Sequence, residues 1–132
     1  IDHEAIGALG TGPQSGLPLG VARYIRMRGE PEAAEVAVTV TDNQQGKGLG
    51  TLLLAFLACR AVSNGITGFR AYVLGNNHRM LKLFKDLGST AETAAAGNVE
   101  VRIPLFADAG SYPATSAGNV FRTISALLAK NR

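Results

Sequence analysis

An alternating strand pattern, a glycine-rich turn and an apolar helix pattern follow one another over residues 34–62, and this order most constrains the fold. Val36, Val38 and Val40 would share one face of a strand, while Glu35, Ala37 and Thr39 would share the other. This alternation predicts a strand at the start of the segment. The turn leads directly into residues 49–62, which are apolar on nearly every side and predict a largely buried helix. The chain therefore places a glycine-rich turn at the junction of a strand and a helix.

The turn has the features of an anion-binding loop. Gly46, Gly48 and Gly50 would let consecutive backbone N–H groups point inward, and a helix N-terminus adds about half a positive charge. A P-loop would require serine or threonine after Lys47, where glycine stands. A dinucleotide fingerprint would require a third glycine farther along the helix, which the sequence lacks. The turn thus suits a pyrophosphate but matches neither of these two motifs.

The rest of the chain predicts an α+β fold in a single domain over residues 1–132. Glycine and proline clusters predict turns over residues 10–18 and 29–32. Further strand patterns cover residues 5–9, 19–28, 69–74 and 99–105, and further helix patterns cover residues 77–88, with Asn77 as N-cap, and 120–128.

Composition excludes several classes of function. Cys59 is the only cysteine, so no intrachain disulfide can form, and with His3 and His78 it provides no zinc-ligand spacing, so no metal is expected. The 13 basic and 10 acidic residues give a net charge of +3, and the basic residues form no block, which argues against a nucleic-acid groove. No apolar run is long enough to span a membrane and the start resembles no secretory signal, so the expected location is the cytoplasm.

Two motifs resemble the GNAT superfamily of N-acetyltransferases. Gln45-Gly-Lys-Gly-Leu-Gly50 is similar to the family's Gln/Arg-x-x-Gly-x-Gly signature, which also follows a valine-rich strand. Asn77-His-Arg-Met-Leu-Lys-Leu-Phe-Lys-Asp-Leu-Gly88 is similar to its Asn-x-x-Ala/Met-x-x-Leu-Tyr-x-x-x-Gly helix. The resemblance covers residues 19–105 and is closest to bacterial protein lysine acetyltransferases. It implies a mixed, mostly antiparallel sheet with splayed parallel strands and helices on both faces, without the family's usual N-terminal helices.

The resemblance also implies a cofactor and a reaction. The chain would transfer acetyl from acetyl-coenzyme A to a primary amine, with a protein lysine favoured as the acceptor. A backbone N–H near Val38 would polarise the thioester carbonyl. The residues implied to surround the coenzyme are Val38, Thr39, Val40, Gln45, Gly46, Lys47, Gly48, Leu49, Gly50, Thr51, Asn77 and Met80.

Glu35 is the residue that the resemblance implies as the general base, acting through water. Partial burial beside Val36 and Tyr24 would raise its basicity. The alternative is a solvated strand residue that pairs with Arg23 or Arg26.

Phe84 departs from the family pattern, because many members have a tyrosine there that protonates the departing thiolate. Either solvent or another hydroxyl, such as that of Tyr24 or Tyr72, would then supply the proton. Two other functions stay open: an acetyltransferase for a small amine, and a non-catalytic module that binds acetyl-coenzyme A. The apolar stripe from Val120 to Leu128 is compatible with covering the sheet or a partner subunit in a homodimer.

Overall fold

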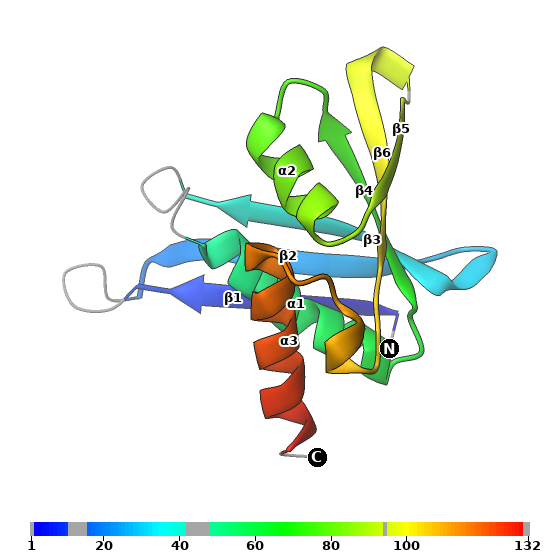
Figure 1. The fold of residues 1–132 in the computed structure, drawn as a ribbon. Coiled ribbons are helices and arrows are strands. Elements are labelled where there is room, and N and C mark those ends of the chain that lie inside the picture. Colours follow the sequence, from blue (N-terminus) through cyan, green and yellow to red (C-terminus); the bar gives the residue numbers. More distant parts are fainter. Residues whose placement is uncertain (1, 11–15, 42–47, 94, 131–132) are drawn as a thin grey trace.

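A computed structural model describes residues 2–10, 16–41, 48–93 and 95–130 as a six-stranded mixed sheet covered by helices (Figure 1). The strands are β1 (His3–Leu9), β2 (Pro18–Met27), β3 (Glu30–Val40), β4 (Gly68–Leu74), β5 (Thr90–Thr93) and β6 (Asn98–Pro104). The α-helices are α1 (Leu49–Ser63), α2 (His78–Asp86) and α3 (Ser116–Ala129), and short 3-10 turns lie at Ala95–Gly97 and Ala109–Ser111. The expected α+β class is confirmed.

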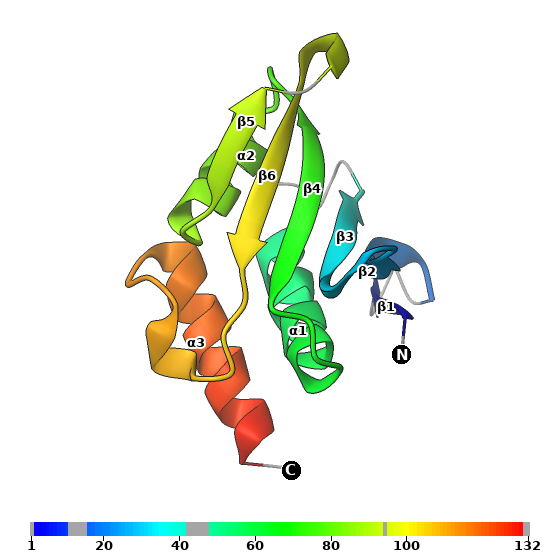
Figure 2. The same ribbon diagram turned by 90° about the vertical axis from the view of Figure 1, so that its right-hand side faces the viewer.

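The sheet contains one parallel pair at its centre. Its strand order is β1-β2-β3-β4-β6-β5, and every neighbouring pair is antiparallel except β3 and β4. The parallel register runs from Ala33↔Gly68 to Glu35↔Arg70, although β3 continues to Val40 and β4 continues to Leu74. Figures 1 and 2 show the two strands spreading apart beyond the paired stretch. The splayed parallel pair expected from the sequence is therefore confirmed.

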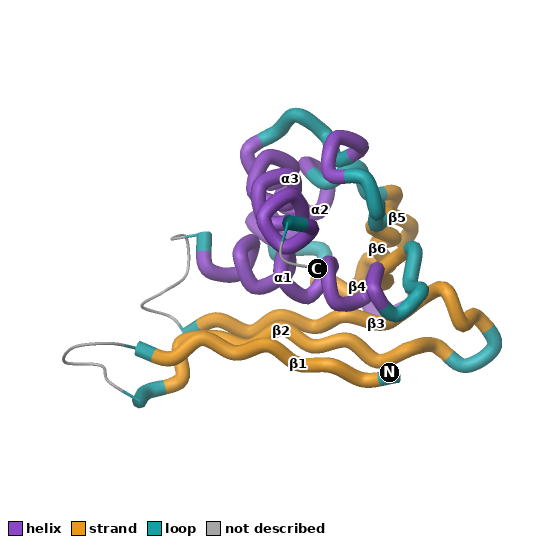
Figure 3. Tube along the Cα trace, turned by 90° about the horizontal axis from the view of Figure 1, so that it is seen from below, coloured by secondary structure: helices purple, strands orange, loops and turns teal. Residues whose placement is uncertain are grey.

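The helices lie over one face of the sheet (Figure 3). Ala34 and Val36 of β3 are buried beneath α1, whereas Glu35, Ala37 and Thr39 alternate with them and are exposed on the opposite face. The inward-facing residues of the sheet form one continuous core with buried residues of all three helices. The sequence predicted helices on both faces; in the described part of the chain they cover only this one, which we call the inner face.

Several element boundaries differ from those expected. Strand β3 begins at Glu30, and the turn before it is shortened to Arg28 and Gly29, where Gly29 has a φ of 79°. Pro31 is tolerated in β3 because it lies beside a register shift between Arg26 and Met27, where the regular ladder is interrupted. Strand β5 was missed, since its residues are all exposed and show no apolar alternation.

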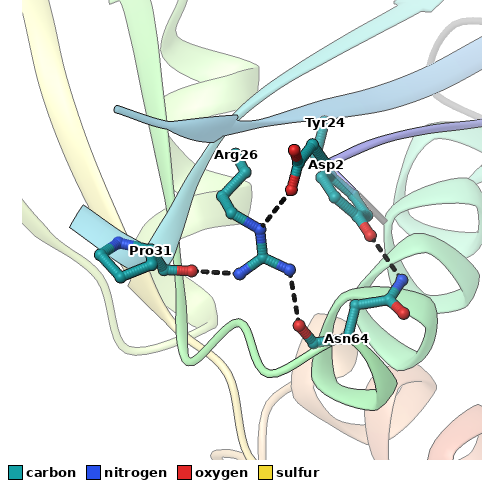
Figure 4. A network of polar contacts seen from close by, with 5 residues as sticks. All are labelled: Asp2, Tyr24, Arg26, Pro31 and Asn64. Carbon is teal, nitrogen blue, oxygen red and sulfur yellow. Dashed lines mark hydrogen bonds and ion pairs between the residues drawn. The ribbon is translucent and has the colours of Figure 1, made fainter. Parts of the chain in front are cut away.

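A network around Arg26 fixes the C-terminal end of α1 against the sheet (Figure 4). Arg26 Nε donates to Asp2 Oδ1 at 3.0 Å, Nη2 donates to the Asn64 carbonyl at 2.6 Å, and Nη1 donates to the Pro31 carbonyl. Asn64 Nδ2 donates to the Tyr24 hydroxyl at 2.8 Å. The guanidinium thus lies at the negative end of the α1 dipole, and the network sets the direction in which the other end of the helix points. No helix in the described ranges is long and apolar enough to cross a membrane.

Candidate functional site

A cavity of about 760 Å³ lies where the end of β3, the start of α1, helix α2 and the start of α3 meet. Every predicted coenzyme-contacting residue that the structure describes lines this cavity: Val38, Thr39, Val40, Gly48, Leu49, Gly50, Thr51, Asn77 and Met80. Gln45, Gly46 and Lys47 lie outside the described residues. The fold therefore brings together positions from three elements, while their contact with a coenzyme stays a prediction.

The backbone of β3 faces the space beside β4 at Val38. Thr41 N donates to the Leu19 carbonyl of β2 at 2.9 Å, and the backbone groups of successive strand residues point to opposite edges. Thr67 N donates to the Glu32 carbonyl at 2.7 Å, so the backbone N–H and C=O groups of the even-numbered residues of β3 point toward β4. Val38 therefore directs its N–H and C=O toward β4, beyond the point where the parallel register ends. This strand edge can pair with an extended ligand that carries amide groups.

The start of α1 is built to attract an anion. Gly48 is the N-cap residue, with a φ of 83°, and the first helical hydrogen bond runs from Leu52 N to its carbonyl. The N–H groups of residues 49–51 precede that bond and therefore have no partner within the helix. No acidic residue lies in this turn, and Arg60 lies in the last turn of the helix. Both features favour a negative ligand at this end.

Gly50 keeps open the space between α1 and the strand. A Cβ at this position would lie 3.6 Å from side-chain methyls of both Val38 and Val40. The contact would be an ordinary one for the protein, but the side chain would occupy the cavity that the glycine lines. The strand edge, the helix N-terminus and this open space together fit a pyrophosphate joined to an extended amide-bearing arm.

Helix α2 forms the second wall of the cavity. Asn77 Oδ1 accepts a hydrogen bond from Met80 N at 3.2 Å, so the predicted N-cap is confirmed. Further lining residues on this helix were not predicted from the sequence, namely Arg79, Lys82, Leu83 and Asp86. The spacing of Asn77, Met80 and Leu83 is a helical face and could have identified Leu83. Three lining residues of α3 were not predicted either, because the sequence offers no local signal for them: Ser116, Ala117 and Val120.

Glu35 lies on the exposed face of β3, which we call the outer face, at the last position of the parallel register. Val36 and Tyr24 are buried on the inner face, so the expected burial of Glu35 beside them is wrong. The alternative ion pair between Glu35 and Arg26 is not formed, because the Arg26 side chain binds Asp2, Pro31 and Asn64. Within the described ranges the Glu35 carboxylate makes no ion pair.

The tyrosines divide into buried and exposed positions. Tyr24 is fully buried and its hydroxyl lies beside Asn64, the C-cap of α1, whereas the cavity lies at the start of that helix, so Tyr24 is not placed to donate a proton there. Tyr112 is also buried, its hydroxyl accepts from Phe106 N at 3.1 Å, and burial raises its pKa. Tyr72 is 50% exposed and lies on the outer face of β4, just beyond Arg70. Phe84 is buried in the core and carries no hydroxyl.

A carboxyl group with a shifted pKa lies away from the cavity. Arg60 Nε donates to Glu4 Oε2 at 2.8 Å and Nη2 donates to Oε1 at 3.0 Å, which joins α1 to β1. The hydrogen bonds from Arg60 lower the pKa of the Glu4 carboxyl. This pair is structural. Among the described residues, no group of three histidine, cysteine or acidic side chains is placed to hold a metal ion.

Comparison with known proteins matches this arrangement to one family. The model described as "Acetyltransferase (GNAT) family" matches residues 2–88. Acetyltransferase Pat of Mycolicibacterium smegmatis is 38% identical over 85 residues, which are 63% of this chain and 26% of that protein. The crystal structure of the GNAT domain of S. lividans PAT has 34% identity and a TM-score of 0.69, and the match covers 80% of this chain and 62% of that one.

A second solved structure shares the fold at lower identity. It is a Salmonella typhimurium protein that was solved with its cofactor acetyl-CoA, and it is 23% identical with a TM-score of 0.61. The match covers 74% of this chain and 63% of that one. The present chain spans about a quarter of the length of the curated relative that it matches.

Proposed function

Because the chain belongs to the GNAT acetyltransferase family, we propose that it transfers an acetyl group from acetyl-coenzyme A to a primary amine, with a protein lysine as the favoured acceptor. The single observation that carries this proposal is the divergence of β3 and β4 beside the N-terminus of α1, within one cavity. The name of the 38% identical relative, Acetyltransferase Pat, supports acetyl transfer.

The coenzyme would be held by backbone groups of β3 and α1. The N–H groups at residues 49–51 would bind the pyrophosphate, together with Gln45, Gly46 and Lys47 of the preceding turn. The backbone of Val38 and Val40 would pair with the pantetheine amides as an added strand would. Asn77 and Met80 would contact the same arm from α2. Bound acetyl-coenzyme A supplies the activated acyl group.

Val38 N–H would stabilise the charge that develops on the thioester oxygen. This amide points toward the gap between the strands, where the arm would lie. Because a backbone donor is held in place before the reaction, it requires no reorganisation when charge develops, and such a donor is typically worth about 3 kcal/mol in acyl transfer.

Glu35 would remove the proton that the acceptor must lose. A lysine ammonium has a pKa of about 10.4 and is almost fully charged at neutral pH. Glu35 lies where the strands begin to diverge, on the outer face, so the acceptor would approach from the side opposite the helices. Since the carboxylate is exposed, we expect it to accept the proton through a water molecule.

Tyr72 would return a proton to the departing thiolate. The amine nitrogen forms the new bond to the acyl carbon while the carbon–sulfur bond breaks, so the sulfur leaves with the electron pair. Tyr72 shares the outer face with Glu35, on the opposite strand of the diverging pair. Of the two tyrosines that the sequence offers as proton donors, Tyr24 is buried and only Tyr72 is accessible. Solvent is the alternative source of the proton.

The charges around the gap favour a protein lysine over a polyamine. A polyamine carries several positive charges and would need several carboxylates. On the outer face beside Glu35, Arg23 is exposed, and two nearby carboxylates are engaged by arginines: Glu30 by Arg70, and Glu100 of β6 by Arg102 at 3.9 Å. Such a surface suits an acceptor with a single amine.

An acetyl-transfer assay with radiolabelled acetyl-coenzyme A tests this proposal. The protein is incubated with a panel of lysine-containing proteins and, separately, with polyamines, amino acids and aminoglycosides. We expect label on protein lysines. Label on the small amines alone would show that the acceptor class is wrong. Tight coenzyme binding without label on either panel would instead identify a non-catalytic binding module, which the hydroxyl-free Phe84 favours.

A further inference from the structure

Helix α3 lies outside the residues that match the family model, yet it lines the same cavity as β3 and α1. We propose that α3 forms the wall that receives the nucleotide end of coenzyme A, the adenosine 3′-phosphate. Val120 and Ala117 would contact the adenosine, and Arg79 of α2 would bind the 3′-phosphate. This inference rests on the proposed function, because it takes coenzyme A as the ligand.

The position of the pyrophosphate divides the cavity into two parts. If the N–H groups at the start of α1 bind the pyrophosphate, the two ends of the coenzyme must leave that point in different directions. The pantetheine arm follows β3, which accounts for the lining residues Val38 and Val40. The walls that remain are contributed by α2 and α3, including Leu83, Ala117 and Val120. The nucleotide end is the part of the ligand still to be placed.

The chemistry of these remaining walls suits an adenosine phosphate. Val120 is half-buried and Ala117 is buried, so they present apolar surface to one side of the cavity. Arg79 is exposed and makes no ion pair with another described side chain. Lys82 lines the same wall but forms an i,i+4 ion pair with Asp86 at 3.1 Å, so Arg79 is the lining cation that has no carboxylate partner among the described side chains.

The start of α3 is held firmly enough to act as a wall. Thr115 Oγ1 donates to the Asp86 carbonyl at the end of α2 at 2.6 Å, and it accepts from Gly118 N at 3.0 Å as the N-cap. A side chain at Gly118 would overlap the Pro113 carbonyl, so the helix approaches the preceding loop closely. Phe121 anchors the next turn in the core. The cavity-facing residues of α3 are therefore fixed relative to α2.

Calorimetric binding of coenzyme A and of adenosine 3′,5′-bisphosphate, which represents the nucleotide end, tests the inference. Val120→Glu places a carboxylate against the adenosine phosphate and should weaken binding of both ligands at least tenfold. Thr123→Glu adds the same charge at an exposed position of α3 that does not line the cavity, and it should change affinity less than twofold. Val120→Ala removes only apolar contact and should weaken binding of both ligands about threefold. This variant replaces Val120→Glu in the test if the glutamate variant does not fold.

Arg79→Ala provides an independent measurement. The wild-type protein should bind coenzyme A more tightly than dephospho-coenzyme A, which lacks the 3′-phosphate, and the variant should lose this preference. Wild-type affinity for the bisphosphate in folded Val120 variants would overturn the inference while leaving the proposed function intact. Failure of the wild-type protein to bind acetyl-coenzyme A would instead overturn the proposed function and, with it, this inference.

Discussion

Gly48 and Gly65 flank helix α1 and provide a matched pair of substitutions. Gly48 has a φ of 83° and Gly65 a φ of 82°, and a Cβ added at either position would meet no atom of the described residues within 4 Å. An alanine at either site therefore carries the same backbone strain without steric overlap. The left-handed conformation costs about 1–2 kcal/mol for a residue with a Cβ, and the lower entropy of the unfolded chain offsets part of this cost. We expect each variant to lose about 1 kcal/mol of stability, which lowers Tm by about 4 °C for a domain of this size.

The two variants should differ in coenzyme binding. Gly48 orients the N–H groups that would bind the pyrophosphate, whereas Gly65 follows the opposite end of the helix. Gly48 lines the cavity, so the added methyl group would keep the pyrophosphate away from one of these N–H groups. A hydrogen bond to a charged group contributes about 1.5–3 kcal/mol, so Gly48→Ala should raise the Kd for acetyl-coenzyme A about 10-fold to 100-fold. Gly65→Ala should leave the Kd unchanged. Thermal unfolding and calorimetry measure the two effects separately. Equal affinities in the two variants would refute the assignment of the pyrophosphate to this helix end.

Four further substitutions test the remaining roles. Glu35→Gln should lower kcat about tenfold or more while coenzyme affinity stays unchanged, because Glu35 does not line the cavity; unaltered turnover at pH 7 would remove Glu35 from the role of base. Tyr72→Phe should lower kcat several-fold without loss of thermal stability, since the side chain is half-exposed; an unchanged kcat would assign the proton to solvent. Asn77→Ala should cost about 1 kcal/mol in urea unfolding through loss of the α2 cap, and wild-type stability would contradict that role. The lowered pKa of Glu4 means that its bond to Arg60 stabilises the fold above the usual carboxyl pKa and that this stability is lost as pH falls through the folded pKa. Stability measured by urea unfolding should therefore fall less steeply on acidification in Glu4→Gln, and identical pH profiles would count against the pair.

The sequence predicts the elements of the site that depend on local patterns. The valine alternation of β3, the glycine before α1 and the Asn77 cap each reflect chemistry within a few neighbouring residues, and the structure contains all three. The same alternation could have corrected one error. Glu35 and Val36 are adjacent in a strand, so they point to opposite faces and cannot share a buried environment.

The features that the sequence did not predict arise from tertiary packing. The contribution of α3 to the cavity depends on its docking against the end of α2 through Thr115, and the residues involved are distant from the glycine-rich turn. The placement of α1 and α2 on a single face follows from the order β3-β4-β6-β5, because the crossovers from β3 to β4 and from β4 to β5 proceed in the same direction and share one handedness. Helix α3 follows the last strand and is held on the same face by its core residues Phe121 and Ile124. Local periodicity carries no information about that order.

Amide NMR spectra of isotope-labelled protein during titration with coenzyme A would show whether backbone amides of β3 and α1 hold the coenzyme. We expect the largest shifts at Val38, Leu49, Gly50 and Thr51, with small shifts at Gly65 and along β1. Saturable binding that leaves these four amides unchanged and shifts amides elsewhere would place the coenzyme at a different site.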